Sequence, residues 1–98
     1  MICTFGIWNV KEGREDDFER RWQQGVNGAA LDYPEVTFRL LRDRTSPRRF
    51  VSTTEGWRTV EQVEAMRETP DYQDFVAGLW RLLDSGETST FELVAEVS

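Results

Sequence analysis

Few side chains in this sequence could carry catalysis by the common routes. The chain has no histidine, the usual general base near neutral pH and the commonest ligand of zinc and haem iron. A Ser-His-Asp triad, an HExxH zinc site and a histidine-ligated haem are therefore excluded. Cys3 is the single cysteine, so there is no internal disulfide and no CxxC motif, and we interpret it as a small strand residue. No calcium-binding loop of the DxDxDG type is present, and we expect no bound metal.

The charge balance argues against two classes of partner. The formal net charge is -6, with 18 acidic residues against 12 basic ones. Such a protein repels nucleic acid and anionic membranes unless its basic residues are segregated. Residues 39–49 hold five arginines, but Asp43 interrupts them and no aromatic residues of the base-stacking type are interleaved. We expect no nucleic-acid partner and no membrane partner, and we interpret these arginines as solvated or paired across a dimer with Glu92 or Glu96.

The elements that would position a site follow from turn residues and hydrophobic spacing. Ile2 to Val10 is rich in β-branched and aromatic residues and ends at a Lys-Glu-Gly turn, which predicts a strand. Apolar residues at three- and four-residue spacing predict a helix from Arg14 to about Asp32. Two further strands, Val36 to Arg44 and Arg49 to Trp57, are expected to form a hairpin.

The second half of the chain predicts a broken helix and a closing strand. Thr59 begins a short helix with a capping-box spacing, and Thr69-Pro70 restarts the helix, which we expect to end at Ser85-Gly86. Thr88 to Val97 then predicts a strand. The order is the ferredoxin-like βαββαβ pattern, an α+β fold with a four-stranded antiparallel sheet. Residues 1–98 are expected to form one domain.

The first strand carries apolar residues on both of its faces. Trp8 and Val10 share one face, while Cys3, Phe5 and Ile7 share the other. Helices on one side of the sheet leave the second face uncovered, so we predict a homodimer formed sheet against sheet. No basic stretch precedes this strand, and no apolar run reaches the ~18 residues of a membrane span. We therefore expect a cytoplasmic location.

Three stretches of the sequence match one family pattern. They are Phe5 to Glu15 followed by Phe18, the hairpin from Leu40 to Ser52 followed by Trp57, and the closing Phe91 to Val97. Together they extend over essentially the whole chain and resemble the antibiotic biosynthesis monooxygenase family, whose members are dimeric α+β barrels. The family includes cofactor-free oxygenases that act on aromatic polyketide intermediates, haem-degrading enzymes and many proteins of unknown role.

The haem-degrading branch of the family requires residues that this chain lacks. Those members use an asparagine in the first strand, a tryptophan after the third and an iron-ligating histidine on the following helix. Trp57 matches the tryptophan, but the asparagine position falls near Gly6 or Ile7 and the histidine position near Met66 or Arg67. The resemblance therefore implies no haem here, and we expect no cofactor.

The cofactor-free oxygenases supply a second set of positions. They pair the tryptophan with an asparagine four residues earlier and a tyrosine six residues later, and these positions are Thr53 and Val63 here. Such an enzyme needs an apolar pocket for an electron-rich phenol or hydroquinone, polar groups that stabilise its anion, and room for dioxygen. The substrate itself supplies the electrons.

The resemblance and the residue types together define a candidate site. Trp57 is expected to be catalytic by family position, Arg67 as a contact to a phenolate, and Tyr72 as a proton donor. Each has a structural alternative: core packing for the two aromatic residues and a solvated helix position for the arginine. The expected substrate pocket consists of Trp8, Thr53, Met66 and Trp80.

We therefore predict a cofactor-independent monooxygenase that oxidises a small aromatic, polyketide- or quinol-like molecule with dioxygen. The alternative is a non-catalytic dimer of the same fold that binds a small ligand or acts in a stress response. A fold hosts several functions, so the polar groups of the site have to decide between them.

Overall fold

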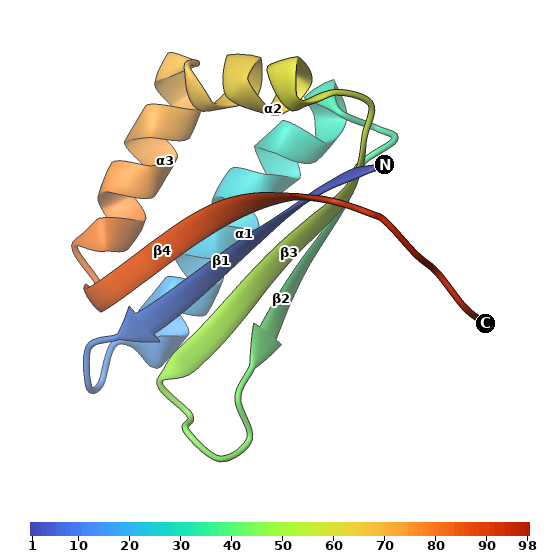
Figure 1. The fold of residues 1–98 in the computed structure, drawn as a ribbon. Helices are drawn as coiled ribbons and strands as arrows, with labels where there is room; N and C mark the ends of the chain where they lie inside the picture. Colours follow the sequence, from blue (N-terminus) through green and yellow to red (C-terminus); the bar gives the residue numbers. More distant parts are fainter.

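Four antiparallel strands form one sheet, and three helices pack on a single face of it (Figure 1). The structure, a computed structural model, describes residues 1–98. The strand order across the sheet is β2-β3-β1-β4. This arrangement confirms the predicted ferredoxin-like α+β fold. The elements are β1 (Ile2–Val10), α1 (Glu15–Asp32), β2 (Thr37–Arg42), β3 (Arg49–Trp57), α2 (Val60–Arg67), α3 (Pro70–Trp80) and β4 (Leu83–Glu92).

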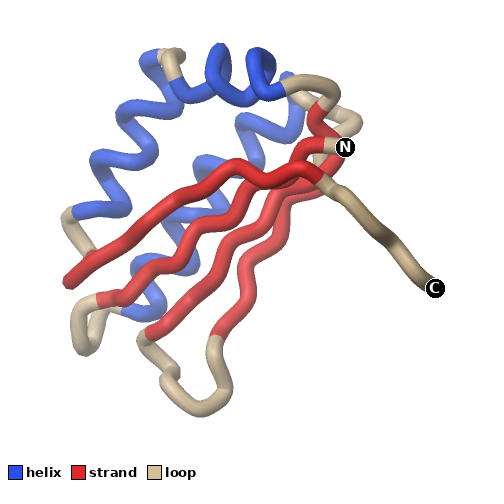
Figure 2. The backbone as a smooth tube through the Cα atoms, viewed as in Figure 1, coloured by secondary structure: helices blue, strands red, loops and turns tan.

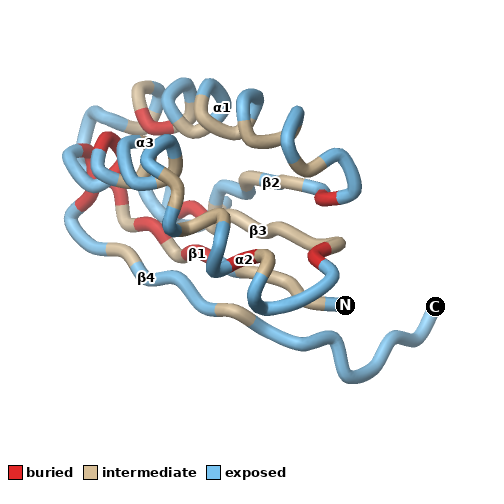
Figure 3. The backbone as a smooth tube through the Cα atoms, turned by 90° about the horizontal axis from the view of Figure 1, so that it is seen from above, coloured by how far each residue is buried: buried red, intermediate tan, exposed pale blue.

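The central strand β1 divides its side chains between the two faces of the sheet. Successive strand residues point to opposite faces, so Gly6, Trp8 and Val10 face the helices and are buried. Phe5 lies on the other face and is 42% exposed. In the view from above, α1 lies on one side of the strands and no helix lies beyond β4 (Figure 3).

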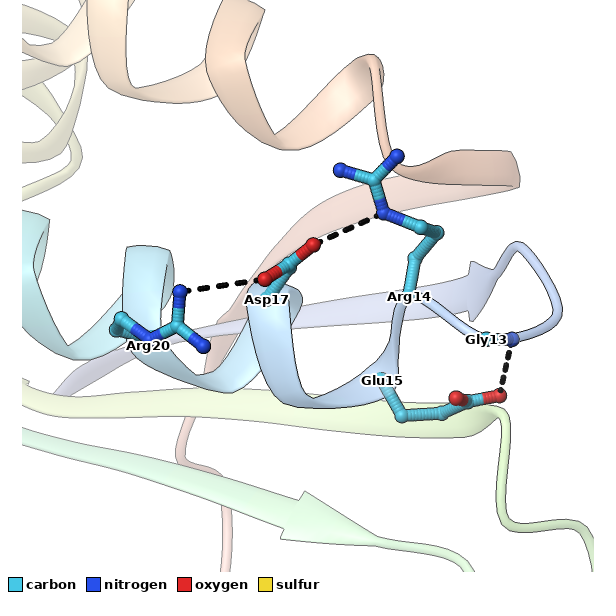
Figure 4. Close-up of polar contacts among 5 residues, drawn as sticks. All are labelled: Gly13, Arg14, Glu15, Asp17 and Arg20. Carbon is cyan, nitrogen blue, oxygen red and sulfur yellow. Dashed lines mark hydrogen bonds and ion pairs between the residues drawn. The ribbon is translucent and has the colours of Figure 1, made fainter.

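The start of α1 is organised by charge. The chain turns at Gly13, whose φ of 82° is unfavourable for other residues, and its amide donates to the Glu15 carboxylate at 3.3 Å. Asp17 accepts hydrogen bonds from Arg14 at 3.0 Å and from Arg20 at 3.2 Å (Figure 4). All these groups are solvent-accessible, so they add little stability individually. Their acidic members do suit the positive end of the helix dipole.

The segment after α3 differs from the prediction. We expected the helix to continue to Ser85-Gly86 and the last strand to span Thr88–Val97, but α3 ends at Trp80 and β4 occupies Leu83–Glu92. The helical spacing was misleading because Leu82 and Leu83 are both buried in the core without being helical. Leu82 lies in the turn after α3, and Leu83 is the first residue of β4. Residues 93–98 continue past the sheet as an irregular tail (Figure 2).

The core consists of two separate clusters of buried residues. The larger includes Trp8, Phe18 and Phe50 and lies where α1 begins and α3 ends. The smaller consists of Trp57 with two valines, close to α2. Between them, the inward-facing positions of the sheet hold small or hydroxyl-bearing residues instead of large apolar ones. The division of the core leaves space in the middle of the layer.

The hairpin between β2 and β3 depends on Asp43. Its carboxylate accepts backbone hydrogen bonds from Thr45 at 2.8 Å and Ser46 at 3.1 Å, and it pairs with Arg49 at 3.2 Å. These interactions, the Thr45 amide first, hold the pKa of Asp43 below its ordinary value of 3.8. A lowered folded-state pKa contributes stability above the unfolded pKa, and this contribution is lost as the pH falls through the folded pKa.

Replacing Asp43 with alanine is expected to lower the thermal unfolding midpoint at pH 7. The effect should shrink as the pH falls from the unfolded pKa of about 3.8 through the lowered pKa of the native carboxylate. Circular dichroism melts from pH 7 down to pH 3 would measure the difference. Asp84→Ala is the control, because Asp84 is exposed and lies 3.8 Å from its partner Arg48. An Asp43→Ala effect that is independent of pH would contradict the assignment.

Candidate functional site

A cavity of about 410 Å³ lies between the sheet and the helices, in the space that separates the two core clusters. Its walls include aromatic rings from Trp22 of α1, Phe38 of β2, and Tyr72 and Phe75 of α3. Three carboxylate-bearing residues also border it: Asp32, Asp71 and Asp74. This volume is within the range of small-molecule sites, which are mostly apolar with a few well-placed polar groups.

Hydroxyl groups form the floor of the cavity. Thr4 of β1, Ser52 and Thr54 of β3, and Thr88 of β4 face the helices because they occupy the same side of the sheet as Trp8. The Trp8 indole Nε1 donates to Ser52 Oγ at 2.9 Å. The hydroxyls of Thr4 and Thr54 are hydrogen-bonded to each other.

Two glycines of α1, Gly25 and Gly28, border the same cavity. A Cβ at Gly25 would overlap the ring of Phe75, whereas a Cβ at Gly28 would meet nothing within 4 Å. The missing side chain at Gly25 therefore lets the Phe75 ring pack directly against α1.

The two glycines provide a matched pair of substitutions. Gly28→Ala is expected to stabilise the protein by about 1 kcal/mol through helix propensity. Gly25→Ala has the same helical benefit but displaces Phe75, so we expect it to be about 1 to 2 kcal/mol less stable than Gly28→Ala. Urea unfolding measures both, and equal stabilities would show that Phe75 does not depend on this close approach.

Arg67, at the end of α2, is the one cationic residue that borders the cavity. Its Nη1 donates to Thr90 Oγ1 on β4 at 3.2 Å, which holds the side chain across the sheet. Its Nε is buried and has no hydrogen-bond partner. A buried donor without an acceptor is costly, so this guanidinium is equipped to receive an additional acceptor.

Four of the seven residues predicted for the site border the cavity: Trp8, Met66, Arg67 and Tyr72. They come from the central strand β1 and from the consecutive helices α2 and α3, which are far from β1 in the sequence (Figure 1). The structure therefore brings two of the three predicted catalytic residues together in one space.

The other three predicted residues do not border the cavity. Thr53 lies on the opposite face of the sheet, because it pairs with Phe5 and strand residues alternate. Trp80 is 45% exposed, and its ring makes a T-shaped contact with Trp8 at 6.4 Å between centroids. Family position and residue type contain no information about which face a strand residue occupies.

Trp57 is 1% exposed and belongs to the smaller core cluster. β3 has a bulge just before Trp57. In the pairing of β3 with β1, Trp57 lies opposite Ile2 and Glu55 lies opposite Cys3, so Gly56 has no partner, and its φ is 103°. This bulge places Trp57 on the helix side, although Glu55 faces the other way. The Trp57 Nε1 donates to Thr54 Oγ1 at 2.6 Å, so Trp57 contacts the cavity floor through that hydroxyl.

The floor hydroxyls were not predicted from the sequence. Their signal is the composition of inward-facing strand positions: β1 has Thr4 and Gly6 between larger residues, and β3 has Ser52 and Thr54 after Phe50. Small and polar residues at the centre of a buried face indicate a cavity. Finding them requires the strand register, which the sequence alone does not supply.

The structure shows neither a metal-binding group nor a membrane helix. No three or more cysteine, aspartate or glutamate side chains are grouped closely enough to hold a metal ion. None of the helices is both long and apolar enough to cross a membrane.

The fold and the cavity define a class of protein: a ferredoxin-like α+β domain with an aromatic-lined space between its sheet and its helices. The family model for antibiotic biosynthesis monooxygenases matches residues 1–78. The chain therefore belongs to the antibiotic biosynthesis monooxygenase family. A comparison with curated protein sequences found no match.

Solved structures show the same fold at low sequence identity. SnoaB, a cofactor-independent oxygenase from Streptomyces nogalater solved as an asparagine-to-alanine variant, is 16% identical with a TM-score of 0.84, covering 98% of this chain and 95% of that one. A conserved protein from Methanosarcina mazei Go1 is 13% identical with a TM-score of 0.81, covering 92% and 89%. The Pseudomonas aeruginosa protein PA3566 is 18% identical with a TM-score of 0.79, covering 96% and 94%.

Proposed function

We propose that this protein is a cofactor-independent monooxygenase that oxidises a small aromatic, polyketide- or quinol-like substrate with dioxygen. The observation that carries the proposal is the 410 Å³ cavity, lined by aromatic rings and hydroxyls, with Arg67 as its one cation. Family membership and the structural likeness to a cofactor-independent oxygenase support it.

The proposed reaction draws its electrons from the substrate. For an anthrone-type substrate, ring-linked CH₂ and O₂ become C=O and H₂O: the substrate loses two hydrogens, one oxygen atom forms the carbonyl and the other leaves as water. The step that the protein must assist is ionisation of the substrate to an electron-rich phenolate or enolate. Arg67 stabilises that anion by placing a guanidinium at the border of the cavity.

Tyr72 has a smaller part in the proposal. Its side chain borders the cavity from the first turn of α3, where the helix is capped by Thr69. From this position its phenol can donate a proton to a reduced oxygen species or to the substrate. Trp57 does not border the cavity, and its proposed role is to position the Thr54 hydroxyl through a hydrogen bond.

Oxygen uptake tests the proposed function directly. The protein is mixed with a panel of anthrones and dihydroquinones in an oxygen electrode, with the protein-free rate subtracted, and we expect uptake together with formation of the quinone. No uptake above the protein-free rate with any substrate would favour the non-catalytic ligand-binding dimer. A haem titration is expected to show no Soret shift.

The proposed assembly is a homodimer formed through the open face of the sheet. Phe5 and Phe91 stack edge to face on this face at 5.3 Å between ring centroids, although they are 42% and 51% exposed. Leu41 of β2 extends the apolar surface. Apolar residues gathered on one face of a small domain are typical of a protein interface.

Replacing Phe5 with aspartate is expected to convert the homodimer to a monomer, because the dimer would bury a charge without a partner. Light scattering at micromolar concentration measures the change in mass. Phe5→Leu keeps the surface apolar and should remain dimeric. A wild-type protein that is itself monomeric at this concentration would refute the proposed assembly.

A further inference from the structure

Two indole N–H groups donate to hydroxyls on the cavity floor. Trp8 Nε1 donates to Ser52 Oγ at 2.9 Å, and Trp57 Nε1 donates to Thr54 Oγ1 at 2.6 Å. An indole N–H can only donate, so both hydroxyls must act as acceptors in these contacts. Both tryptophans are well buried, at 5% and 1% exposure, and both hydroxyls border the cavity.

The remaining hydroxyl protons can be counted. Ser52 accepts from Trp8 and keeps its own proton. Thr4 and Thr54 share one hydrogen bond, which uses one of their two protons, whichever residue donates. One proton of that pair is therefore left. The cavity floor thus has three O–H protons without a protein acceptor: one from Ser52, one from the Thr4–Thr54 pair, and one from Thr88, which is exposed to solvent.

The spacing of these donors follows from strand geometry. Ser52 and Thr54 are two residues apart on the same face of β3, which separates them by roughly 7 Å along the strand. Aromatic rings form the walls on both sides, and the nearby guanidinium of Arg67 also only donates. A ligand that complements this floor has to supply acceptors.

We infer that Ser52 and the Thr4–Thr54 pair determine the ligand specificity of the cavity as hydrogen-bond donors, held in place by Trp8 and Trp57, and that they select a ring system with oxygen acceptors on two of its edges. The inference rests on the proposed function, because it assigns the substrate class of the same site. It predicts that a quinone or phenolate form binds better than the equivalent hydrocarbon.

A pair of soluble probes isolates the acceptors. Anthraquinone-2-sulfonate and anthracene-2-sulfonate have the same ring framework and the same anionic group, and they differ in the two carbonyl oxygens. Isothermal titration calorimetry of the wild-type protein is expected to show at least about tenfold tighter binding of the quinone, as two modest hydrogen bonds would provide. The measurement requires no turnover.

Substitutions at neighbouring positions then locate the donors. Ser52→Ala is expected to reduce the preference to about threefold, and so is the double substitution Thr4→Val with Thr54→Val, which removes both protons of the pair. Thr53→Val is the matched control, since Thr53 carries the same side chain on the opposite face of the sheet, and it should leave the preference unchanged. Circular dichroism confirms that each variant is folded. Ser52→Ala tests the inference by itself if the Thr4→Val/Thr54→Val double variant does not fold.

Equal binding of the two probes by the wild-type protein, or binding of neither, would overturn the inference. So would a preference that persists in full in both Ser52→Ala and the Thr4→Val/Thr54→Val double variant, or one that Thr53→Val removes. Failure of the oxygenase proposal gives a different result: no oxygen uptake, with the preference intact. Oxygen uptake without any preference would leave the oxygenase proposal standing and refute this one.

Discussion

A variant in which Trp57 is replaced by alanine is expected to lose about 3–5 kcal/mol of unfolding free energy. The indole is 1% exposed and is the largest side chain of the smaller core cluster, where it packs against Val36, Val63 and the ring of Tyr33. Its removal creates a cavity and leaves the Thr54 hydroxyl without its donor. For a domain of 98 residues, this is a large part of the total stability.

Urea unfolding followed by circular dichroism measures the Trp57 effect. Trp80→Ala is the control, because that side chain is 45% exposed and we expect a smaller loss. Trp57→Phe preserves most of the packing and removes the N–H, so it separates the hydrogen bond from the volume. If Trp57→Ala were no less stable than Trp80→Ala, the assignment of Trp57 to the core would be contradicted.

The second large effect is expected at Arg67. Replacing it with alanine should reduce kcat/KM for oxygen uptake by about 100-fold, comparable to the loss of one donor from an oxyanion-stabilising site. The physical reason is that Arg67 is the one cation bordering the cavity, with a buried Nε that lacks an acceptor. Arg67→Lys keeps the charge but loses the fork of donors, so intermediate activity is expected.

The pH profile distinguishes stabilisation of an anion from a structural role. If Arg67 lowers the pKa of the bound phenol, its removal raises that pKa, and the rise of kcat with pH moves to more alkaline values. Arg58→Ala is the control, since Arg58 is an exposed residue just before α2. An Arg67→Ala variant whose rate falls equally at every pH would indicate that the side chain only supports the fold.

Most of the fold was predictable because it depends on local patterns. β1 and β3 have the predicted bounds. Thr59 caps α2 as predicted, because its hydroxyl accepts a hydrogen bond from the backbone N–H of Gln62 at 3.1 Å. The end of α3 and the start of β4 were predicted wrongly, because a pair of leucines fits the apolar spacing of a helix and the buried start of a strand equally well. Local spacing identifies which residues are apolar, but the sheet decides where the final strand pairs.

The candidate site was only partly predictable for the same reason. Residue type and family position indicated Trp8, Met66, Arg67 and Tyr72, which border the cavity. The same approach placed Thr53 in the pocket, although its neighbour Thr54 is the residue that faces the cavity. A shift of one residue along a strand reverses the face, so a site on a sheet cannot be assigned without the register.

The sequence by itself determined the exclusion of histidine chemistry, the element order and the two apolar faces of β1, since these follow from composition and periodicity. The tertiary structure decided which hydroxyls face the cavity and where Trp57 lies. At Gly56 the backbone adopts a φ of 103°, and the bulge turns Trp57 from the open face of the sheet into the core. A side chain at Gly56 would overlap the carbonyl of Glu35. This contact between residues 21 positions apart in the chain exists only in the folded protein.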